Sequence, residues 1–253
     1  MLYFHCWSGG KDSTASVILD HEMELPPSTI VMSEVMFDKT RGITGENPAH
    51  MEWVHTKAKP LFESWGYKVE IIHAEKDYLD CFYHRLEKSK YPERIGKRAG
   101  FPIGGNRCTI KRDLKIRAIE KYYRQFQGQE ITQYISIAAD EYGRLESMEG
   151  TNQVSLLAKY GYTEIMAKAK CLEYDLLSPQ YGISNRGGCW FCPNQGFSEF
   201  AHTKRYYPEL YAELERLSKE PDLVSKYFRY DRTFDEVNER VDFELAQQSM
   251  FDP

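Results

Sequence analysis

The segment Ser8-Gly9-Gly10-Lys11-Asp12-Ser13 has the residue types and spacing of a phosphate-binding turn. It follows an apolar run, Leu2–Trp7, and precedes a helical pattern over Ser13–Asp20, which predicts a strand, a glycine turn and a helix start. Two adjacent glycines let the backbone turn sharply and direct its N–H groups into one concavity. The helix dipole favours anions at the same place, and Ser8 and Ser13 add hydroxyl groups. The segment therefore predicts a phosphate cradle, the alternative being a serine–glycine turn that only starts a helix.

The Walker sequence GxxxxGK[ST] cannot be written through these residues. They resemble instead the PP-loop, SGGxDS, of the ATP pyrophosphatases. Those enzymes cleave ATP between the α and β phosphates, leave AMP on a substrate and release pyrophosphate. The resemblance implies that Lys11 and Asp12 help to place phosphate and Mg²⁺. It also implies that the serines and glycines of the segment bind the pyrophosphate part of ATP: Ser8, Gly9, Gly10 and Ser13.

A second apolar run ends at Met36-Phe37-Asp38 and has a place in the same resemblance. In PP-loop enzymes the matching segment lies beside adenine. This implies that the backbone of Met36 and Phe37 hydrogen-bonds the base edge and that Asp38 lies near the nucleotide. A plain strand end with a solvated aspartate is the alternative.

Asp140 and Glu141 follow another apolar run, and Arg144 lies just beyond them. Paired carboxylates at the carboxyl end of a strand, opposite a phosphate loop, have the chemistry to hold Mg²⁺ between phosphate groups. The Arg144 guanidinium would neutralise charge on the α-phosphate as an adenylate forms. A capped turn is the alternative.

The six cysteines form the second set of candidate functional residues, because cysteines in a reducing compartment are more often ligands or nucleophiles than disulfide partners. Cys189 and Cys192 form a C-x-x-C in a glycine- and proline-rich turn, which is typical of a metal-binding knuckle. Cys108 and Cys171 would complete four thiolates, which suit a 4Fe-4S cluster or a structural zinc ion. For Cys171 the alternative is a buried helical residue that binds no metal. A redox C-x-x-C is the competing interpretation. The other two cysteines are expected in the core: Cys6 and Cys81.

Taken in order, the motifs resemble the phosphoadenosine-phosphosulfate reductase family of PP-loop proteins, and more narrowly its phage- and prophage-type members that carry GCWFCPN. The likeness covers about residues 1–200, and its motifs are SGGKDS, Arg107-Cys108-Thr109, Asp140-Glu141 and GCWFCP. Two departures matter. Sulfonucleotide reductases carry their catalytic thiol in a C-terminal Glu-Cys-Gly-Leu-His tail, whereas no cysteine follows Cys192 here. Adenylylsulfate reductases have tandem cysteines where this chain has Cys108-Thr109.

Other relatives, such as tRNA 2-thiocytidine synthetase and the DNA phosphorothioation enzyme, combine a PP-loop with an iron–sulfur cluster. In the tRNA thiolases three cysteines hold the cluster and leave one iron open to bind sulfur. Adenylation makes an acceptor oxygen a leaving group, and sulfide then displaces AMP. The resemblance therefore implies ATP-dependent adenylation coupled to sulfur transfer, with the acceptor and the sulfur donor left open.

Two rival functions remain at this stage. A sulfonucleotide reductase-like enzyme would lack its usual C-terminal nucleophile. A non-catalytic nucleotide-binding module with a structural zinc ion would bind ATP without releasing pyrophosphate.

A strongly basic segment spans residues 85–124, where thirteen basic side chains face four acidic ones. Such an excess suits a polyanionic acceptor, either RNA, DNA or a sulfonucleotide. A solvated helix face with a few ATP-phosphate contacts is the alternative.

Strand and helix patterns alternate along the chain. This predicts an α/β fold with a parallel twisted sheet flanked by helices, which by resemblance is of the adenine-nucleotide α-hydrolase type. Loop 8–13 would then follow the first strand at its carboxyl end, where such sheets bind ligands. Strands are predicted at residues 2–7, 29–36, 68–73, 133–138 and 162–166, and helices at residues 12–21, 48–65, 78–88 and 109–125.

Size and composition fit this fold. The 253 residues, 42% of them hydrophobic, suit one large domain with an extension. We expect a PP-loop ATP-binding domain at residues 1–175, and a Cys knuckle with a helical C-terminal cap at residues 176–253. A partner-docking or homodimer surface is the alternative role of the extension. The net charge of −5 argues against nucleic-acid binding over the whole surface, and the lack of a long apolar run or basic leader favours a cytoplasmic protein that does not enter membranes.

Overall fold

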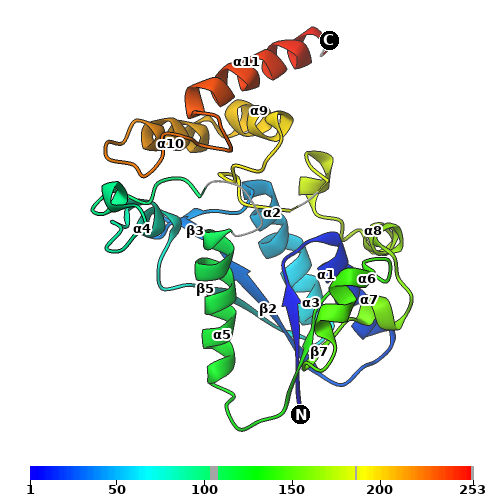
Figure 1. Cartoon of the computed structure of the whole chain (residues 1–253). Helices are drawn as coiled ribbons and strands as arrows, with labels where there is room; N and C mark the ends of the chain where they lie inside the picture. Colours follow the sequence, from blue (N-terminus) through cyan, green and yellow to red (C-terminus); the bar gives the residue numbers. More distant parts are fainter. Residues whose placement is uncertain (103–107, 186, 252–253) are drawn as a thin grey trace. The chain divides into compact units, whose positions relative to one another are not determined.

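The chain forms two compact units (Figure 1). The structure, a computed structural model, describes residues 1–102, 108–185 and 187–251, with side chains up to residue 247. Arg107, which is part of the family resemblance, lies outside the described residues. The boundary expected at residue 175 does not follow the division into units. Each unit combines three separate stretches of chain, which are residues 1–34, 48–73 and 118–187 in the first and residues 35–47, 74–117 and 188–253 in the second.

A five-stranded parallel sheet forms the centre of the first unit, with the strand order β5-β2-β1-β6-β7. Tyr3 pairs with Ser28 on one side of β1, and Leu2 pairs with Ile131 on the other. The carboxyl end of β1 is therefore the point where the strand order reverses, which is where sheets of this kind bind ligands. The strands are β1 (Leu2–Trp7), β2 (Ser28–Glu34), β5 (Lys68–His73), β6 (Ile131–Tyr134) and β7 (Gln153–Val154).

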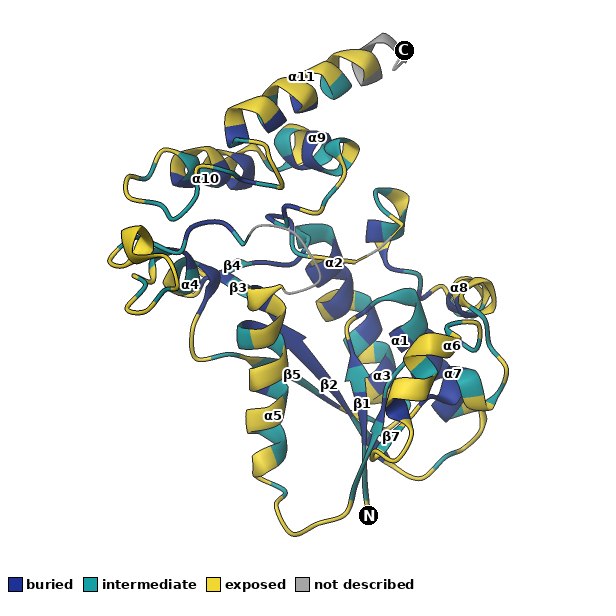
Figure 2. Cartoon of the chain, viewed as in Figure 1, coloured by how far each residue is buried: buried dark blue, intermediate teal, exposed yellow. Residues whose placement is uncertain are grey.

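Helix α1 leaves the carboxyl end of β1 and is buried on nearly all sides (Figure 2). Val17 and Ile18 pack in one apolar cluster with the segment that follows residue 48, while Ala15 and Leu19 pack in a second cluster with α7 and α8. Residues 48–64 form one continuous helix with a π-helical turn, η1, in its middle. The helices of this unit are α1 (Lys11–Glu22), α2 (Pro48–Trp53), η1 (Val54–Ala58), α3 (Lys59–Ser64), α5 (Arg117–Arg124), α6 (Tyr142–Leu145), α7 (Leu156–Lys159) and α8 (Glu164–Glu173).

Strand β1 is covered on both faces, because successive side chains of a strand point to opposite sides. Phe4 packs against Tyr123 of α5, with ring centroids 5.1 Å apart. Trp7 packs against Phe62 of α3, with ring centroids 5.3 Å apart. Burial on both faces accounts for the nearly continuous apolar sequence of this strand.

A buried polar group fixes α1 to the sheet. The Asp20 carboxylate accepts hydrogen bonds from Nε2 of His5 at 3.0 Å and from the Ser28 hydroxyl at 2.8 Å. His5 and Asp20 are each 1% exposed, so both polar groups need these partners inside the core. The two bonds join β1, the C-terminal part of α1 and the start of β2.

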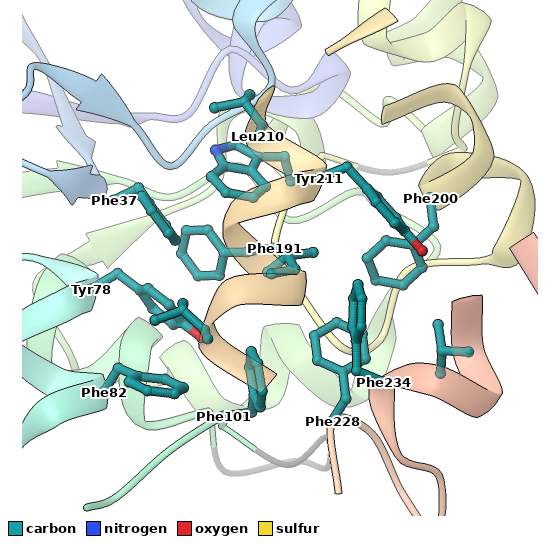
Figure 3. Packing of buried hydrophobic residues seen from close by; sticks show 14 of the residues in the cluster. Phe37, Tyr78, Phe82, Phe101, Phe191, Phe200, Leu210, Tyr211, Phe228 and Phe234 are labelled. Atoms are coloured by element: carbon teal, nitrogen blue, oxygen red, sulfur yellow. The ribbon is translucent and has the colours of Figure 1, made fainter. Parts of the chain in front are cut away.

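The second unit packs around an aromatic core (Figure 3). The rings of Tyr78 and Phe191 lie 4.0 Å apart, and Phe37 stacks on Tyr78 at 5.2 Å. The expected helical C-terminal segment is present as α9 to α11, and it contributes Phe200 and Leu214 to this core. The elements are β3 (Met36–Asp38), β4 (Ile43–Thr44), α4 (Tyr78–Tyr83), the π-helical turn η3 (Lys111–Ile116), α9 (Phe197–Tyr206), α10 (Pro208–Ser218) and α11 (Phe234–Phe251).

The parallel α/β architecture predicted from the sequence is confirmed, with four local differences. The strand predicted at residues 133–138 is observed earlier in the chain, as β6 over Ile131–Tyr134. The strand predicted at residues 162–166 is wrong, because the Thr163 hydroxyl accepts a hydrogen bond from the Met166 amide at 3.4 Å and caps helix α8. The helix predicted at residues 78–88 ends at Tyr83, and the next residue, His84, has φ −55° and ψ 126°. The strand predicted at residues 29–36 is interrupted at Val35, where β2 of the first unit ends and β3 of the second begins. Within the described ranges, no helix combines the length and the apolar character needed to cross a membrane.

Replacing Phe62 with alanine is expected to destabilise the first unit by about 3–5 kcal/mol, because the ring is fully buried against Trp7 and its loss leaves a cavity. Urea unfolding followed by tryptophan fluorescence measures the change. Tyr142→Ala is the control in the same unit, since Tyr142 is 74% exposed and its loss should cost under about 0.5 kcal/mol. Equal unfolding midpoints for the two variants would contradict the packing described for α3.

Candidate functional site

Loop 8–13 is held in one conformation by its own serines. Gly9 has φ +69° and Gly10 stands at the N-cap of α1. The Ser13 hydroxyl accepts a hydrogen bond from the Ser8 amide at 3.2 Å and donates one to the Gly10 carbonyl at 3.0 Å. Ser13 therefore ties the two ends of the turn together at the start of a helix.

His50 supports the loop from behind and is 2% exposed. Its Nε2 lies 3.2 Å from the Ser8 carbonyl oxygen, which can only accept, so Nε2 donates this bond. Its Nδ1 lies 2.8 Å from the hydroxyl of Ser178, which is also buried. A Cβ atom on Gly9 would lie 2.3 Å from Cε1 of His50. Both the backbone conformation and the close approach of His50 therefore require glycine at this position.

Tyr181 contacts the first backbone amide of α1. The Lys11 amide donates a hydrogen bond to the Tyr181 hydroxyl at 2.8 Å. Burial raises the pKa of Tyr181, although the Lys11 amide and the Lys11 charge act in the opposite direction. The Tyr181 hydroxyl thus binds the Lys11 amide, which is a helix N-terminal amide of the kind that binds phosphate oxygens.

The Lys11 ammonium lies between two carboxylates. Its Nζ is 2.9 Å from both Asp12 carboxylate oxygens and 3.3 Å from Oε2 of Glu164. Burial raises the pKa of Asp12, and the negative charges of Glu164 and Glu141 raise it further against the effect of Lys11. The structure therefore gathers three carboxylates and one ammonium beside loop 8–13, within the first unit.

Asp140 and Glu141 lie in this unit but are engaged separately. One Asp140 oxygen accepts a hydrogen bond from the Glu164 amide at 3.2 Å, at the start of α8. Glu141 accepts a hydrogen bond from the Ala138 amide at 3.1 Å and pairs with Arg144. These bonds match the capped turn that the sequence left open, and the Mg²⁺ role of the pair stays a prediction.

Sequence reasoning missed four residues around the loop: His50, Glu164, Ser178 and Tyr181. All four residues lie far from residues 8–13 in the sequence and reach the loop only through the tertiary fold. The N-cap pattern Thr163-Glu164 was the available signal that Glu164 begins a helix.

Met36, Phe37 and Asp38 belong to the second unit, where β3 pairs with β4 in antiparallel orientation. The Phe37 side chain is fully buried in the aromatic core. Asp38 accepts hydrogen bonds from the amide of Arg41 at 3.1 Å and from its guanidinium at 2.5 Å. Burial would raise the pKa of Asp38, but these bonds outweigh it and lower the pKa. The Asp38 side chain is thus anchored within its own turn.

The four predicted cysteine ligands divide between the units. Cys108, Cys189 and Cys192 belong to the second unit and Cys171 to the first. Cys171 is fully buried in an apolar cluster, and its thiol donates a hydrogen bond to the Lys11 carbonyl at 3.1 Å. Burial raises its pKa to about 12. Cys171 therefore has the environment of a core cysteine.

The C-x-x-C turn of the second unit is built on backbone and ionic contacts. The Cys192 amide donates to the Cys189 carbonyl at 3.0 Å, and Cys189 forms an isolated antiparallel bridge with Glu46. The Glu46 carboxylate, 6% exposed, pairs with Lys115 of η3 at 2.6 Å. Burial raises the pKa of Cys189, and the charges of Glu46, Cys192 and Cys108 add to that rise while Lys115 opposes it. In the described part of the chain, no three histidine, cysteine, aspartate or glutamate side chains meet as a metal-binding group.

The basic segment at residues 85–124 has many of its charges paired. Asp113 pairs with Arg112 at 2.7 Å and with Arg117 at 3.0 Å, and Arg98 pairs with Glu220. These contacts favour the solvated helix face with local ion pairs. A polyanion role for this segment stays a prediction.

Comparison with known proteins adds no relative: no protein-family model matches the chain, and a search of curated proteins finds no match.

Gly9→Ala is expected to lower the free energy of unfolding by at least about 2 kcal/mol. The alanine would have to adopt the left-handed backbone conformation of Gly9, and its Cβ would clash with the His50 ring. The left-handed conformation alone costs about 1–2 kcal/mol. Urea unfolding measures the change. Gly143→Ala is the control, because a Cβ there has no atom within 4 Å and φ is not positive.

Combining Gly9→Ala with His50→Ala separates the two causes. If the ring contact contributes, the double variant loses less stability than the sum of the two single variants. Strict additivity would show that the contact between Gly9 and His50 has no energetic weight.

Proposed function

We propose that this chain is an ATP pyrophosphatase-type enzyme that adenylates an acceptor and couples adenylation to sulfur transfer. The observation that carries the proposal is the conformation of loop 8–13, with a positive-φ glycine and the N-terminus of a buried helix at the carboxyl end of the central strand. Backbone amides and serine hydroxyls in such a turn suit the pyrophosphate part of ATP. The placement follows the rule for parallel sheets.

In the proposed reaction, an acceptor oxygen attacks the α-phosphorus of ATP, and the bond from that phosphorus to the bridging oxygen breaks to release pyrophosphate. Lys11, held between Asp12 and Glu164, exchanges its carboxylate partners for phosphate oxygens and neutralises the leaving group. Asp12 and Glu141 offer the oxygen ligands that Mg²⁺ prefers. Arg144, 62% exposed, provides charge for the α-phosphate.

Tyr181 has a defined part in this scheme. Its hydroxyl accepts a hydrogen bond from the Lys11 amide at 2.8 Å. A phosphate oxygen takes this amide when ATP binds, and the displaced hydroxyl then donates to the phosphate. The role proposed for Met36 and Phe37 uses backbone groups only, so burial of the Phe37 ring does not conflict with it.

The cysteine set suits a metal centre in its chemistry. Cys108, Cys189 and Cys192 provide thiolate donors in one unit, and thiolates suit iron–sulfur clusters or zinc. Cys171 fits poorly, because its thiol is buried in a core and bonded to the Lys11 carbonyl. Three cysteine ligands match the arrangement implied by resemblance to the tRNA thiolases, in which a bound 4Fe-4S cluster supplies an open iron for sulfide.

A non-catalytic nucleotide-binding module with structural zinc is the second candidate. Its support is that Asp140 and Glu141 are both engaged in local hydrogen bonds, as they would be in a site that performs no chemistry. This candidate and the enzyme differ in one measurable product, pyrophosphate.

Ser13→Ala is expected to weaken ATP binding about ten-fold, because it removes both hydrogen bonds that close the loop. Isothermal titration with ATP and Mg²⁺ measures the affinity. Ser16→Ala is the matched control on the same helix, since the Ser16 hydroxyl is buried and has no hydrogen-bond partner among the described residues.

Pyrophosphate release with a total-RNA acceptor pool should fall at least ten-fold in Lys11→Ala.

Two results would count against the proposal. Equal ATP affinities for Ser13→Ala and Ser16→Ala would remove the phosphate role of the loop. Tight ATP binding with no pyrophosphate release from the wild-type chain under any acceptor would favour the non-catalytic module.

Serine substitution of Cys108, Cys189 or Cys192 is expected to remove most of the bound metal, whereas Cys171→Ser should retain it. Iron, zinc and labile sulfide are measured after anaerobic purification, together with the absorption near ~400 nm that thiolate-bound iron–sulfur clusters give. Cys81→Ser, in the second unit, is the control for loss of a partly buried thiol. Loss of metal in Cys171→Ser alone would return that residue to the ligand set. A colourless wild-type protein with about one zinc ion per chain would make the knuckle structural.

A further inference from the structure

Three arginines of the second unit surround one phenylalanine ring. The guanidinium carbons of Arg229, Arg232 and Arg240 lie 5.1, 6.0 and 5.7 Å from the centroid of Phe197. Arg240 also lies 5.4 Å from the centroid of Phe243. Phe197 begins α9, and Arg240 and Phe243 belong to α11. Arg229 and Arg232 lie in the loop between α10 and α11 (Figure 1). We call these five residues the arginine–phenylalanine patch.

The positive charge of the patch is not compensated within the described residues. None of its three arginines forms an ion pair there, whereas Arg41, Arg98 and Arg216 of the same unit are all paired with glutamates. Burial lowers the pKa of Arg229, and the neighbouring charge of Arg232 lowers it further. Residues 209–253 carry twelve acidic and six basic side chains. The three arginines therefore form a basic cluster within an acidic segment.

Glu236, whose carboxylate feels the charge of Arg232, is already engaged by other groups. The carboxylate of Glu236 accepts hydrogen bonds from the amide and hydroxyl of Thr233, at 2.7 and 2.9 Å, at the start of α11. These bonds lower the pKa of Glu236, and the charge of Arg232 contributes less. The Arg229 guanidinium donates a hydrogen bond to the Gln195 carbonyl oxygen at 3.3 Å. The arginines of the patch form no ion pair among the described residues, so their positive charge stays available to an external anion.

Exposed rings accompany the arginines. Phe243 is 51% exposed and the neighbouring Tyr230 is 75% exposed, and the outer side of α11 is open to solvent (Figure 2). Exposed aromatic rings are platforms for unpaired bases, and guanidinium groups bind phosphates and stack on rings. A free phosphate would use only the arginines, an acidic peptide would leave the rings without a partner, and a duplex keeps its bases stacked inside.

We infer that the arginine–phenylalanine patch binds single-stranded nucleic acid. The inference rests on the proposed function in one respect, since it names a polynucleotide as the class of acceptor for the adenylating site. It places recognition on α9 and α11 rather than on the basic segment at residues 85–124.

The test is fluorescence anisotropy with a labelled single-stranded RNA, the same sequence as single-stranded DNA, and the duplex, each without ATP and over a range of salt. Arg229→Gln, Arg232→Gln and Arg240→Gln should each lower the salt dependence by about 0.7 in the slope of log affinity against log salt. Phe243→Ala should weaken single-strand binding about ten-fold by removing a stacking ring. Arg216→Gln is the matched control, because Arg216 is exposed, lies in the same unit and is paired with Glu213.

The outcomes separate this inference from the ATP proposal. Patch variants should keep the wild-type affinity for ATP, and Ser13→Ala should keep wild-type binding of the single strand. Unchanged binding in the patch variants, duplex bound as tightly as single strand, or competition by poly-glutamate as effective as by the oligonucleotide would each overturn the inference. Thermal unfolding of each variant confirms that the fold is retained.

Discussion

The close approach of His50 to Gly9 is the contact on which the arrangement of the first site depends. The ring stands where a side chain at residue 9 would be, and its Nε2 holds the Ser8 carbonyl. The loop can then turn sharply from the carboxyl end of β1 into the start of α1. Near the other end of α1, the buried Asp20 binds His5 of the strand, so helix and strand keep their relative position. A flexible turn of the same composition would lose the preorganisation that an anion site requires.

In the second unit, hydrophobic burial fixes the cysteine turn. Trp190 and Phe191 lie between Cys189 and Cys192, and both rings are 1% exposed in the aromatic core. The Trp190 indole N–H also donates to the Thr44 carbonyl at 2.8 Å. The two rings between the cysteines therefore anchor the turn in the aromatic core through their packing and through the indole hydrogen bond.

Much of the fold could be predicted because β1, β5 and α1 have local signals that agree with their tertiary surroundings. Loop 8–13 is one such signal, since glycine and serine types at fixed spacing specify the turn. His50 and Tyr181 could not be predicted, because they reach the loop from distant segments through contacts that no local pattern encodes. Cys171 shows a different limit: its residue type suggests a ligand, whereas its position on α8 buries it beside Ala15 and Leu19, and its role as a ligand stays a prediction. Residue chemistry predicts what a side chain can do, and burial decides whether it is free to do it.

The interleaving of the two units has a consequence for how the protein is made. The chain passes between them at residues 34/35, 47/48, 73/74, 117/118 and 187/188. Neither unit is complete until a late stretch of the chain has been synthesised, since the first needs residues up to 187 and the second needs the C-terminal helices. A ribosome-bound chain therefore exposes the apolar strands β1, β2 and β5 before the segments that complete their unit have emerged. The two units also cannot be exchanged as cassettes between genes, so they are expected to change together in evolution as one inherited piece.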